Sequence, residues 1–536
     1  MQVTFANGEA HRASASILIL PVFESELSEP GELLAPVVAA VGPSLLEAAA
    51  EEGFKGRGDQ TFTFHTHGTL PATRVVLVGL GARDGFQAEL LRQAAGRGVK
   101  VAQRVKAASA ALALPQSIDA AVAVRAATEG AILGAYRFDR HKTKGKDKKA
   151  VELTKLTLHL ADGARKSAEL TQALTLGEVV ATSTNWARDL VNEPASIITP
   201  TALAQAISKA GKAAGLKVTV GGRRQIEAQK MGMFLAVARA STEEPQLIHV
   251  AYTPKNAEHA KRPPLALVGK AITFDSGGLS LKPSDGMMDM KIDMAGSAAA
   301  FGAMLAIAKI APPFPVHAFV GACENMIGGN AYKLGDVLVS RAGTTVEVTN
   351  TDAEGRLVLG DILHWAAESQ PFQLIDLATL TGACMVALGH NHTGVFSPSD
   401  EVSRDVLEAA ERAGELMWRL PLHPYLKETL RSEVADMRNS GERYGGASSA
   451  AMFLKEFVGN TPWAHLDIAG PTSSNRERNY FAKGATGVGV RTLVELVRKH
   501  AEAPPAARKV ASRSGAKASP RKGAAPAKSP RARSAN

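Results

Sequence analysis

Two short segments in the second half of the chain place carboxylates beside lysine or arginine and next to glycines. They span residues 268–293 and 350–357. Leu265–Gly269 is apolar and of strand length, so Lys270 and Asp275 are expected at or just past the end of a buried strand. Ligands in open α/β sheets bind outside the carboxyl ends of the strands, which makes these two side chains candidates for a binding site.

The carboxylates of the two segments could converge on one pocket. Asp352 and Glu354 are two residues apart, so in an extended segment both point to the same side and could meet Asp275 and Asp293. Four carboxylates cannot share a pocket at neutral pH without cations, and two divalent metals ~3.5–4 Å apart would supply them. Surface ion pairs and an ordinary turn at 275–278 are the alternative. From spacing alone, both a metal-assisted hydrolase and surface ion pairs stay open.

Other catalytic motifs do not fit. Gly79-Leu80-Gly81 follows a predicted strand, but position 84 holds Asp84 where a dinucleotide fingerprint needs its third glycine. The chain has no G-x-S-x-G, H-E-x-x-H or Walker A motif. Cys323 and Cys384 are interpreted as small core residues, and His390-Asn391-His392 as a polar loop rather than a metal site.

The elements that must position the charged segments alternate between strand and helix patterns, which predicts an α/β fold. In the first 165 residues, strands are expected at 16–23, 61–67, 74–81 and 151–160, and helical segments at 33–52, 86–112 and 120–137. A long helix is expected at 164–191. Beyond it, strands are expected at 265–269, 316–320 and 373–377, and helices at 294–310 and 357–368, giving a mixed, mostly parallel sheet.

This pattern predicts three parts: a smaller N-terminal α/β domain over 1–165, a larger catalytic α/β domain over 166–502, and a disordered basic tail over 503–536. The tail holds nine Lys or Arg and no acidic residue, so it supplies most of the net charge of +10 and leaves +1 on residues 1–502. Its Ala, Pro, Ser, Lys and Arg composition is typical of disorder.

Cysteine content and hydropathy indicate the compartment. Two cysteines cannot build a disulfide framework, which favours a reducing environment. No uninterrupted apolar run reaches the ~18 residues of a membrane span, and the N-terminal apolar stretch lacks a signal-cleavage pattern. We therefore expect a cytoplasmic protein without a membrane anchor.

Several motifs together resemble the leucyl aminopeptidase family, the cytosol aminopeptidases. Residues 350–357 match the family's most distinctive octapeptide, and 268–283 with Met290–Met294 match its other metal-binding part. Further stretches of familial appearance are Ala187–Pro194, Ala378–Ala383 and Thr461–Asp467. The resemblance covers about 165–500 and extends more weakly over the first domain. Residues 503–536 have no counterpart in the family pattern.

The resemblance implies two divalent metal ions per subunit, with Mn or Zn expected, and five ligands: Lys270, Asp275, Asp293, Asp352 and Glu354. By this resemblance Asp275 and Glu354 would bridge the ions. Lys270 and Asp293 would complete one site, and Asp352 would complete the other. A lysine ligand must be neutral, so Lys270 would need a strongly lowered pKa, which a neighbouring dication supplies.

The implied reaction is removal of the N-terminal residue, preferably leucine or another apolar residue, from peptides by a metal-activated water. Lys282 would stabilise the developing charge on the carbonyl oxygen, and Arg356 would anchor a bicarbonate that serves as the base. Met290, Thr379 and Gly382 would line the pocket for the N-terminal side chain. Gly470-Pro471-Thr472 departs from the family pattern at the far side of that pocket.

The family also implies a homohexamer that acts on peptide substrates. The alternative function is a nucleic-acid-associated protein, tethered without sequence preference by the basic residues of 503–536, with peptidase activity secondary. The near-neutral body weakens that alternative, because the positive charge is confined to the tail.

Overall fold

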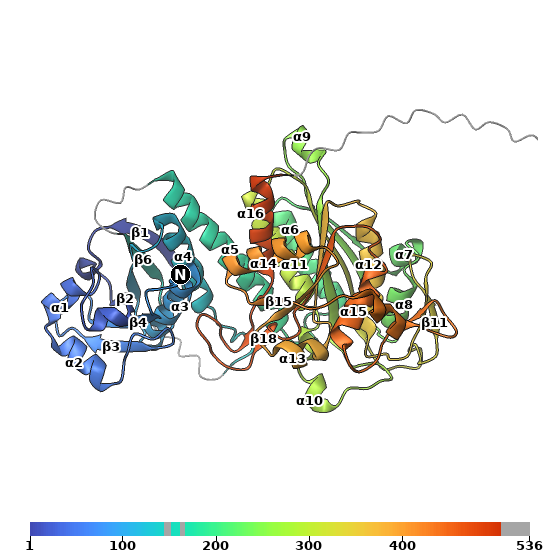
Figure 1. Ribbon diagram of the computed structural model, residues 1–536, viewed down its shortest axis with the longest axis horizontal. Coiled ribbons are helices and arrows are strands. Elements are labelled where there is room, and N and C mark those ends of the chain that lie inside the picture. Colours follow the sequence, from blue (N-terminus) through green and yellow to red (C-terminus); the bar gives the residue numbers. More distant parts are fainter. Residues whose placement is uncertain (144–151, 161–166, 505–536) are drawn as a thin grey trace, which may run out of the picture.

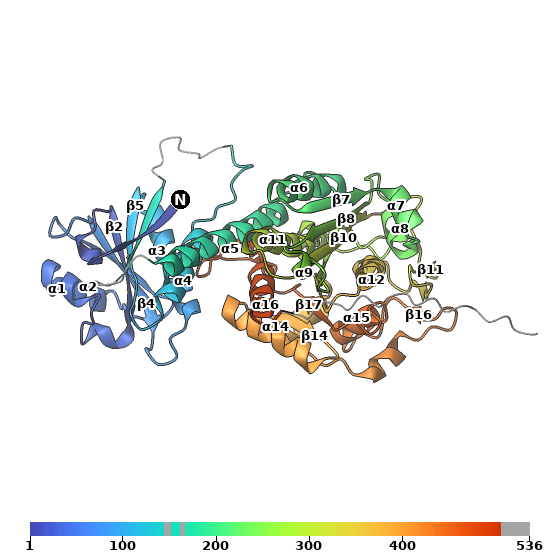
Figure 2. The ribbon, with the colours of Figure 1, turned by 90° about the horizontal axis from the view of Figure 1, so that it is seen from above.

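The computed structural model describes residues 1–143, 152–160 and 167–504. Two α/β units lie side by side and are joined by one long helix, α5 (Ala168–Asn192), as Figures 1 and 2 show. The smaller unit is built from the N-terminal part of the chain and the larger from the rest, which confirms the predicted fold class for the described residues. Most of the basic tail, from residue 505 onward, lies outside the described residues.

The first unit is a six-stranded sheet in the order β1-β6-β5-β2-β4-β3, parallel except at β3–β4. The central strand β2 is apolar throughout because both faces are covered. Its Ile17 and Ile19 face the core beneath α3 and α4, whereas Leu18 and Leu20 face the core beneath α1 and α2. The elements are β1 (Gln2–Asn7), β2 (Ile17–Phe23), α1 (Ala35–Val41), α2 (Ser44–Glu51), β3 (Thr61–His65), β4 (Arg74–Gly81), α3 (Ala88–Arg104), β5 (Ser109–Ala113), α4 (Ala120–Gly134) and β6 (Lys155–Leu160).

The second unit is an eight-stranded mixed sheet in the order β15-β14-β17-β13-β9-β10-β8-β7. The central strands β17, β13, β9 and β10 are parallel, so their carboxyl ends share one edge. The strands are β7 (Lys217–Gly221), β8 (Gln246–Tyr252), β9 (Leu265–Asp275), β10 (Val316–Asn325), β13 (Gln373–Ala378), β14 (Thr393–Phe396), β15 (Met417–Arg419) and β17 (Trp463–Asp467).

Helices cover both faces of this larger sheet. The residues of β9 alternate between two cores: Leu265 and Leu267 face one core, and Ala266 and Val268 face the other. Against the first face pack α6 (Pro200–Ala213), α11 (Ala295–Ile310), α14 (Asp400–Ala413) and α16 (Val490–Glu502). Against the second pack α8 (Gly232–Ala238), α12 (Glu354–Ala367) and α15 (Gly446–Lys455). The shorter α7 (Arg223–Ala228) and α13 (Gly382–Leu388) lie at the rim.

Helix α5 belongs to both units. Leu170 and Ala173 near its start are buried in a core of the first unit, whereas Val180 and Ala187 are buried in the second. Ser167 caps its N-terminus by accepting a hydrogen bond from Leu170 N at 3.1 Å. We keep the domain division at 165/166 as a proposal.

Two local predictions are wrong. The helical segment expected at 86–112 ends at Arg104, and Ser109–Ala113 is instead the inner strand β5. Its alanines favour a helix intrinsically, but pairing with β2 and β6 decides the structure. The segment expected as one helix at 33–52 is two short helices, because Gly42 at φ 87° and Pro43 interrupt it. The edge strand β1 was not predicted.

One segment passes a membrane-span test by length and composition. Residues 284–310 contain an 18-residue window of mean hydropathy 1.3, although no uninterrupted apolar run of that length was noted in the sequence. Within the structure 78% of that window is buried. Its main helix, α11, therefore serves as a core helix between the sheet and α5.

Candidate active site

Side chains at the carboxyl edge of the larger sheet line a cavity of about 1220 Å³. Asp275 ends β9, Asn325 ends β10 and Asp467 ends β17, so the parallel central strands deliver polar groups to one place. The cavity is lined by all ten residues singled out in the sequence: Lys270, Asp275, Lys282, Met290, Asp293, Asp352, Glu354, Arg356, Thr379 and Gly382.

The centre of the site is a buried group of three carboxylates. One oxygen from each of Asp275, Asp293 and Glu354 lies within 4.8 Å of the others. Lys270 Nζ donates to Asp293 Oδ1 at 2.8 Å and to the Thr379 carbonyl at 3.1 Å, and it lies 3.0 Å from Glu354 Oε1. Lys270 projects from within β9, which continues to Asp275 rather than ending at Gly269 as expected.

A second lysine joins the remaining predicted ligand to the group. Lys282 Nζ lies 2.9 Å from Asp275 Oδ2 and also pairs with Asp352. Asp352 precedes α12, and Glu354 is its first residue. The two segments therefore converge. Lys270 lies between Asp293 and Glu354, and Lys282 lies between Asp275 and Asp352.

Burial and like charge raise the pKa of three carboxyl groups of the site, Asp275, Asp293 and Asp352. Desolvation and the neighbouring Glu354 charge raise the pKa of Asp275 from 3.8 to about 6 despite the two lysines. Burial, together with the charges of Glu354 and Asp275, raises the pKa of Asp293 well above its ordinary value. Burial opposes the charge of Lys270, but the carboxylates beside it raise its pKa. Metal ligation would require the neutral amine, so Lys270 would have to lose a proton when it binds an ion.

Glycines allow the backbone to approach these charges. A Cβ on Gly355 would lie 2.3 Å from Lys270 Cε, so any larger residue would displace the lysine. Gly277 has φ +84°, and a Cβ there would lie 2.8 Å from Asp352 Oδ1. The glycines beside the charged residues are thus explained by close packing around the carboxylate group.

Arg356, on the first turn of α12, is buried at the cavity wall. Its Nη1 donates to the Asn439 carbonyl at 2.9 Å, whereas within the described residues its Nε donates no hydrogen bond. Burial lowers the pKa of Arg356 to about 10. The guanidinium therefore remains charged at neutral pH and retains donor capacity at the cavity.

Three buried residues that hold the site were not singled out as functional from the sequence. Asn325 Nδ2 donates to Asp275 Oδ1 at 2.8 Å. Asn439 accepts from Thr349 N at 2.8 Å and donates to the Asn350 carbonyl at 2.6 Å, which fixes the segment before Asp352.

Asp467 accepts from Leu380 N, Thr381 Oγ1 and Ala469 N at 3.2, 2.7 and 3.1 Å. Asp467 thereby connects the residues that follow β13 with those that follow β17 at the cavity wall. Of these three residues, Asp467 alone lay in a motif noted in the sequence.

The predicted pocket residues stand around the carboxylate group. Thr379 Oγ1 donates to Asp293 Oδ1 at 2.7 Å, so this residue touches the cluster directly. Gly382 begins α13 and is exposed, and a Cβ at this position would have no atom within 4 Å. Met290 lies on the short turn before Asp293. The cavity wall also includes Gly470 and Pro471, where the sequence departs from the family pattern.

The donor set suits divalent cations. Among the described residues, Glu354 Oε2 is buried and accepts no hydrogen bond. A buried charged oxygen without a partner costs free energy unless a cation completes it. Buried carboxylate oxygens together with one amine are ligands that Mn²⁺ and Zn²⁺ both accept.

These features define an α/β enzyme with an acidic, cation-accepting centre at the carboxyl edge of its sheet. The family model described as the cytosol aminopeptidase family, catalytic domain, matches residues 185–494, and the model for its N-terminal domain matches 19–145. The chain belongs to the cytosol aminopeptidase family, and it is accordingly an aminopeptidase, a hydrolase of peptides.

Relatives and solved structures agree with that assignment. The "Probable cytosol aminopeptidase" of Geobacter sp. (strain M21) is 41% identical over 499 residues, covering 93% of this chain and 100% of the relative. That of Solibacter usitatus (strain Ellin6076) is 43% identical over 92% and 99% of the two chains. A mutant of tomato leucine aminopeptidase superposes with a TM-score of 0.85 at 34% identity, covering 93% and 96%. The bottromycin maturation enzyme BotP in complex with Mn gives 0.80 at 34% identity, covering 91% and 100%.

Proposed function

We propose that the chain is a two-metal aminopeptidase whose ions are held by Lys270, Asp275, Asp293, Asp352 and Glu354. The observation that carries this proposal is the convergence of the buried carboxylates of Asp275, Asp293 and Glu354, of which Glu354 Oε2 has no hydrogen-bond donor among the described residues. Lys270 would coordinate as the neutral amine, so its proton must leave when the site is filled. The Mn named in the BotP complex supports Mn or Zn here.

Two bound divalent ions would supply an acidic bridging water and an electrophile for the scissile carbonyl. The chain's own contribution begins with Lys282, whose ammonium stands beside Asp275 and can donate to the carbonyl oxygen as negative charge develops. Arg356 offers a charged fork at the cavity wall, which suits a planar anion such as bicarbonate. Such an anion would accept the proton of the attacking water.

The cavity wall supports a preference for leucine or another apolar N-terminal residue. Met290 supplies a flexible apolar surface to the cavity, and a Cβ on Gly382 would have no atom within 4 Å. Thr379 contributes through its contact with Asp293 rather than through bulk. An apolar methionine and a glycine at these positions support an apolar N-terminal side chain as the preferred substrate.

The proposed function is tested with a leucyl peptide and its N-acetylated form. The free peptide should lose leucine in the presence of Mn²⁺, and the acetylated peptide should remain intact because the free amino group is required. Chelator should abolish the release. Cleavage of the acetylated peptide, or release that persists after exhaustive chelation, would contradict the proposal.

We also infer a homohexamer in the cytoplasm. The family resemblance supports the assembly, and the relatives, which are named as probable cytosol aminopeptidases, support the compartment. Light scattering coupled to size-exclusion chromatography measures the assembly directly.

A further inference from the structure

One segment of the catalytic unit lies between the first unit and the cavity. Residues 475–481, here termed the bridging segment, follow the strand β18 (Ser473–Ser474). The cavity that contains the carboxylate cluster is also lined by Gln87, Glu89 and Gln93 of the first unit and by every residue of the bridging segment except Glu477. The first unit therefore reaches the same cavity as the proposed metal ligands.

Helix α3 of the first unit holds the bridging segment through polar contacts along its length. Tyr480 donates from its hydroxyl to Glu89 Oε1 at 2.9 Å. Further along the helix, Arg97 Nη1 donates to Asn479 Oδ1 at 3.0 Å, and Lys100 Nζ donates to the Phe481 carbonyl at 2.5 Å.

The packing between these contacts is equally close. Gly96 of α3 lies against Tyr480, since a Cβ on that glycine would lie 2.6 Å from Tyr480 Cβ. Residues 479–481, the end of the bridging segment, are thus held on the helix.

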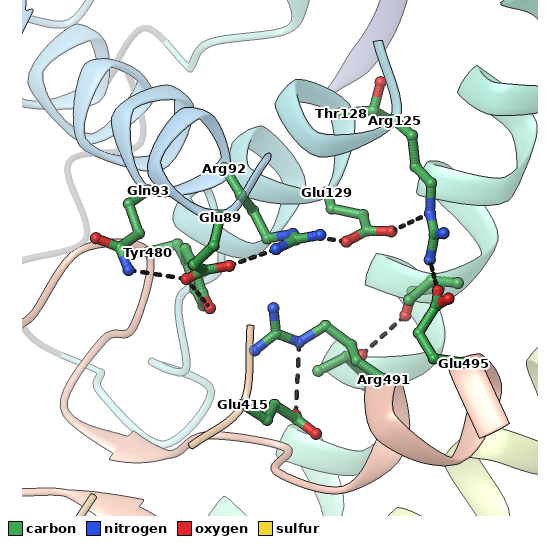
Figure 3. A network of polar contacts seen from close by, with 12 residues as sticks. Glu89, Arg92, Gln93, Arg125, Thr128, Glu129, Glu415, Tyr480, Arg491 and Glu495 are labelled. Atoms are coloured by element: carbon green, nitrogen blue, oxygen red, sulfur yellow. Dashed lines mark hydrogen bonds and ion pairs between the residues drawn. The ribbon is translucent and has the colours of Figure 1, made fainter. Parts of the chain in front are cut away.

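Helix α3 is itself fixed by a buried network of ion pairs, shown in Figure 3. Arg92 pairs with Glu89 and, at 2.7 Å, with Glu129 of α4. Arg125 joins Glu129 at 2.7 Å and reaches Glu495 on α16 of the catalytic unit. The network therefore connects the helix that holds the bridging segment to both units.

Two arginines of the bridging segment line the cavity, whereas the residue between them contacts helix α3. Glu477 faces α3, where Lys100 Nζ lies 3.3 Å from its Oε1. Its neighbours Arg476 and Arg478 line the cavity. Within the described residues neither guanidinium forms an ion pair or hydrogen bond through its side chain, and both are exposed to solvent. Two unpaired guanidinium groups at the cavity suit a carboxylate, which they can bind through paired hydrogen bonds.

We propose that the bridging segment is a specificity element for the part of the peptide beyond the scissile bond, with Arg476 and Arg478 binding the terminal carboxylate of short peptides. This inference rests on the proposed aminopeptidase function and adds a substrate class to it: short peptides with a free C-terminus. Tyr480 is a positioning residue in this account, because it holds the segment on α3 without reaching the substrate carboxylate. The N-terminal unit then takes part in substrate selection through α3.

The test compares three substrates: leucine p-nitroanilide, the tetrapeptide Leu-Gly-Gly-Gly, and the same tetrapeptide with a C-terminal amide. The wild-type protein should prefer the free acid to the amide in kcat/KM by about ten-fold. Arg476→Gln/Arg478→Gln should remove that preference by raising KM for the acid, while kcat/KM for leucine p-nitroanilide stays within about two-fold. The matched control is Arg57→Gln/Arg224→Gln, two exposed arginines that do not line the cavity.

A second variant tests the positioning role. Tyr480→Phe keeps the packing of its Cβ against Gly96 but removes the hydroxyl that binds Glu89, so it should raise KM for the acid and reduce the acid–amide preference without lowering kcat. Tyr252→Phe is its control, since that hydroxyl donates to the Pro312 carbonyl at 3.2 Å and does not line the cavity.

The outcomes separate the two proposals. No acid–amide preference in the wild type, or an unchanged preference in the arginine double variant, would overturn the inference while leaving the peptidase intact. Failure of the wild type to hydrolyse all three substrates with Mn²⁺ would instead contradict the proposed function.

Discussion

Glu129 offers a measurable test of how the two units are held together. Its side chain is 1% exposed and lies between Arg92 and Arg125, each 2.7 Å away. Burial alone would raise the pKa of Glu129, but the two arginines lower it from 4.5 to about 2. At 1.36 kcal/mol per pKa unit, this shift corresponds to about 3 kcal/mol of stability at neutral pH.

Glu129→Gln removes the charge and leaves two buried guanidinium groups with one partner fewer. Breaking a buried ion pair from one side costs about 3–5 kcal/mol, which agrees with the value from the pKa. Equilibrium unfolding in urea at pH 7, followed by circular dichroism at fixed protein concentration, measures the loss. Glu47→Gln, at an exposed site on α2, should change the unfolding free energy by less than about 0.5 kcal/mol.

The pH dependence gives a second check on Glu129. Because its folded-state pKa lies below that of the unfolded chain, its contribution is fully present above pH 4.5 and is lost as pH falls towards 2. The difference between wild type and Glu129→Gln should shrink over that interval. A loss below about 1 kcal/mol at pH 7, or a difference independent of pH, would refute the reasoning.

Further predictions concern the site and the tail. Lys282→Ala should lower kcat by about 100- to 1000-fold with unchanged metal content, since it removes a donor to the developing oxyanion; loss of metal by elemental analysis would make Lys282 a ligand instead. Asp467→Ala should lower the free energy of unfolding in urea by about 1–3 kcal/mol and raise KM, because it leaves the donors at Leu380, Thr381 and Ala469 unpaired. A variant with wild-type stability and wild-type KM would contradict the role given to Asp467. A chain ending at Glu502 should hydrolyse leucyl peptides as the full chain does, and should not retard duplex DNA at low salt; equal retardation by both would place nucleic-acid binding outside residues 503–536.

Sequence reasoning succeeded where a local pattern and the final environment agree. The apolar run at Ile17–Phe23 is buried on both faces, so its hydrophobicity alone identifies a central strand. The grouping of Asp275, Asp293 and Glu354 could be anticipated because each lies in a short motif, and the contact between β9 and α12 brings those motifs together.

Sequence reasoning failed where distant contacts decide the outcome. Ser109–Ala113 is a strand because it pairs on both sides, although its alanines favour a helix. Tyr480 and Glu89 are 391 residues apart in the sequence, so no local pattern could predict the hydrogen bond between them. The same holds for Asn439, whose support of Asn350 follows from the approach of two distant segments.

The most direct test of the proposed site is a metal titration of the wild-type protein against Glu354→Gln. After exhaustive chelation, Mn²⁺ is added back while bound metal is measured by elemental analysis and leucine release from a leucyl peptide is followed. We predict that wild-type activity rises from zero to its maximum as two ions bind per chain, and that Glu354→Gln binds fewer ions and stays inactive although folded by circular dichroism. Full wild-type activity without bound metal, or a Glu354→Gln variant with wild-type turnover, would contradict the assignment of the site.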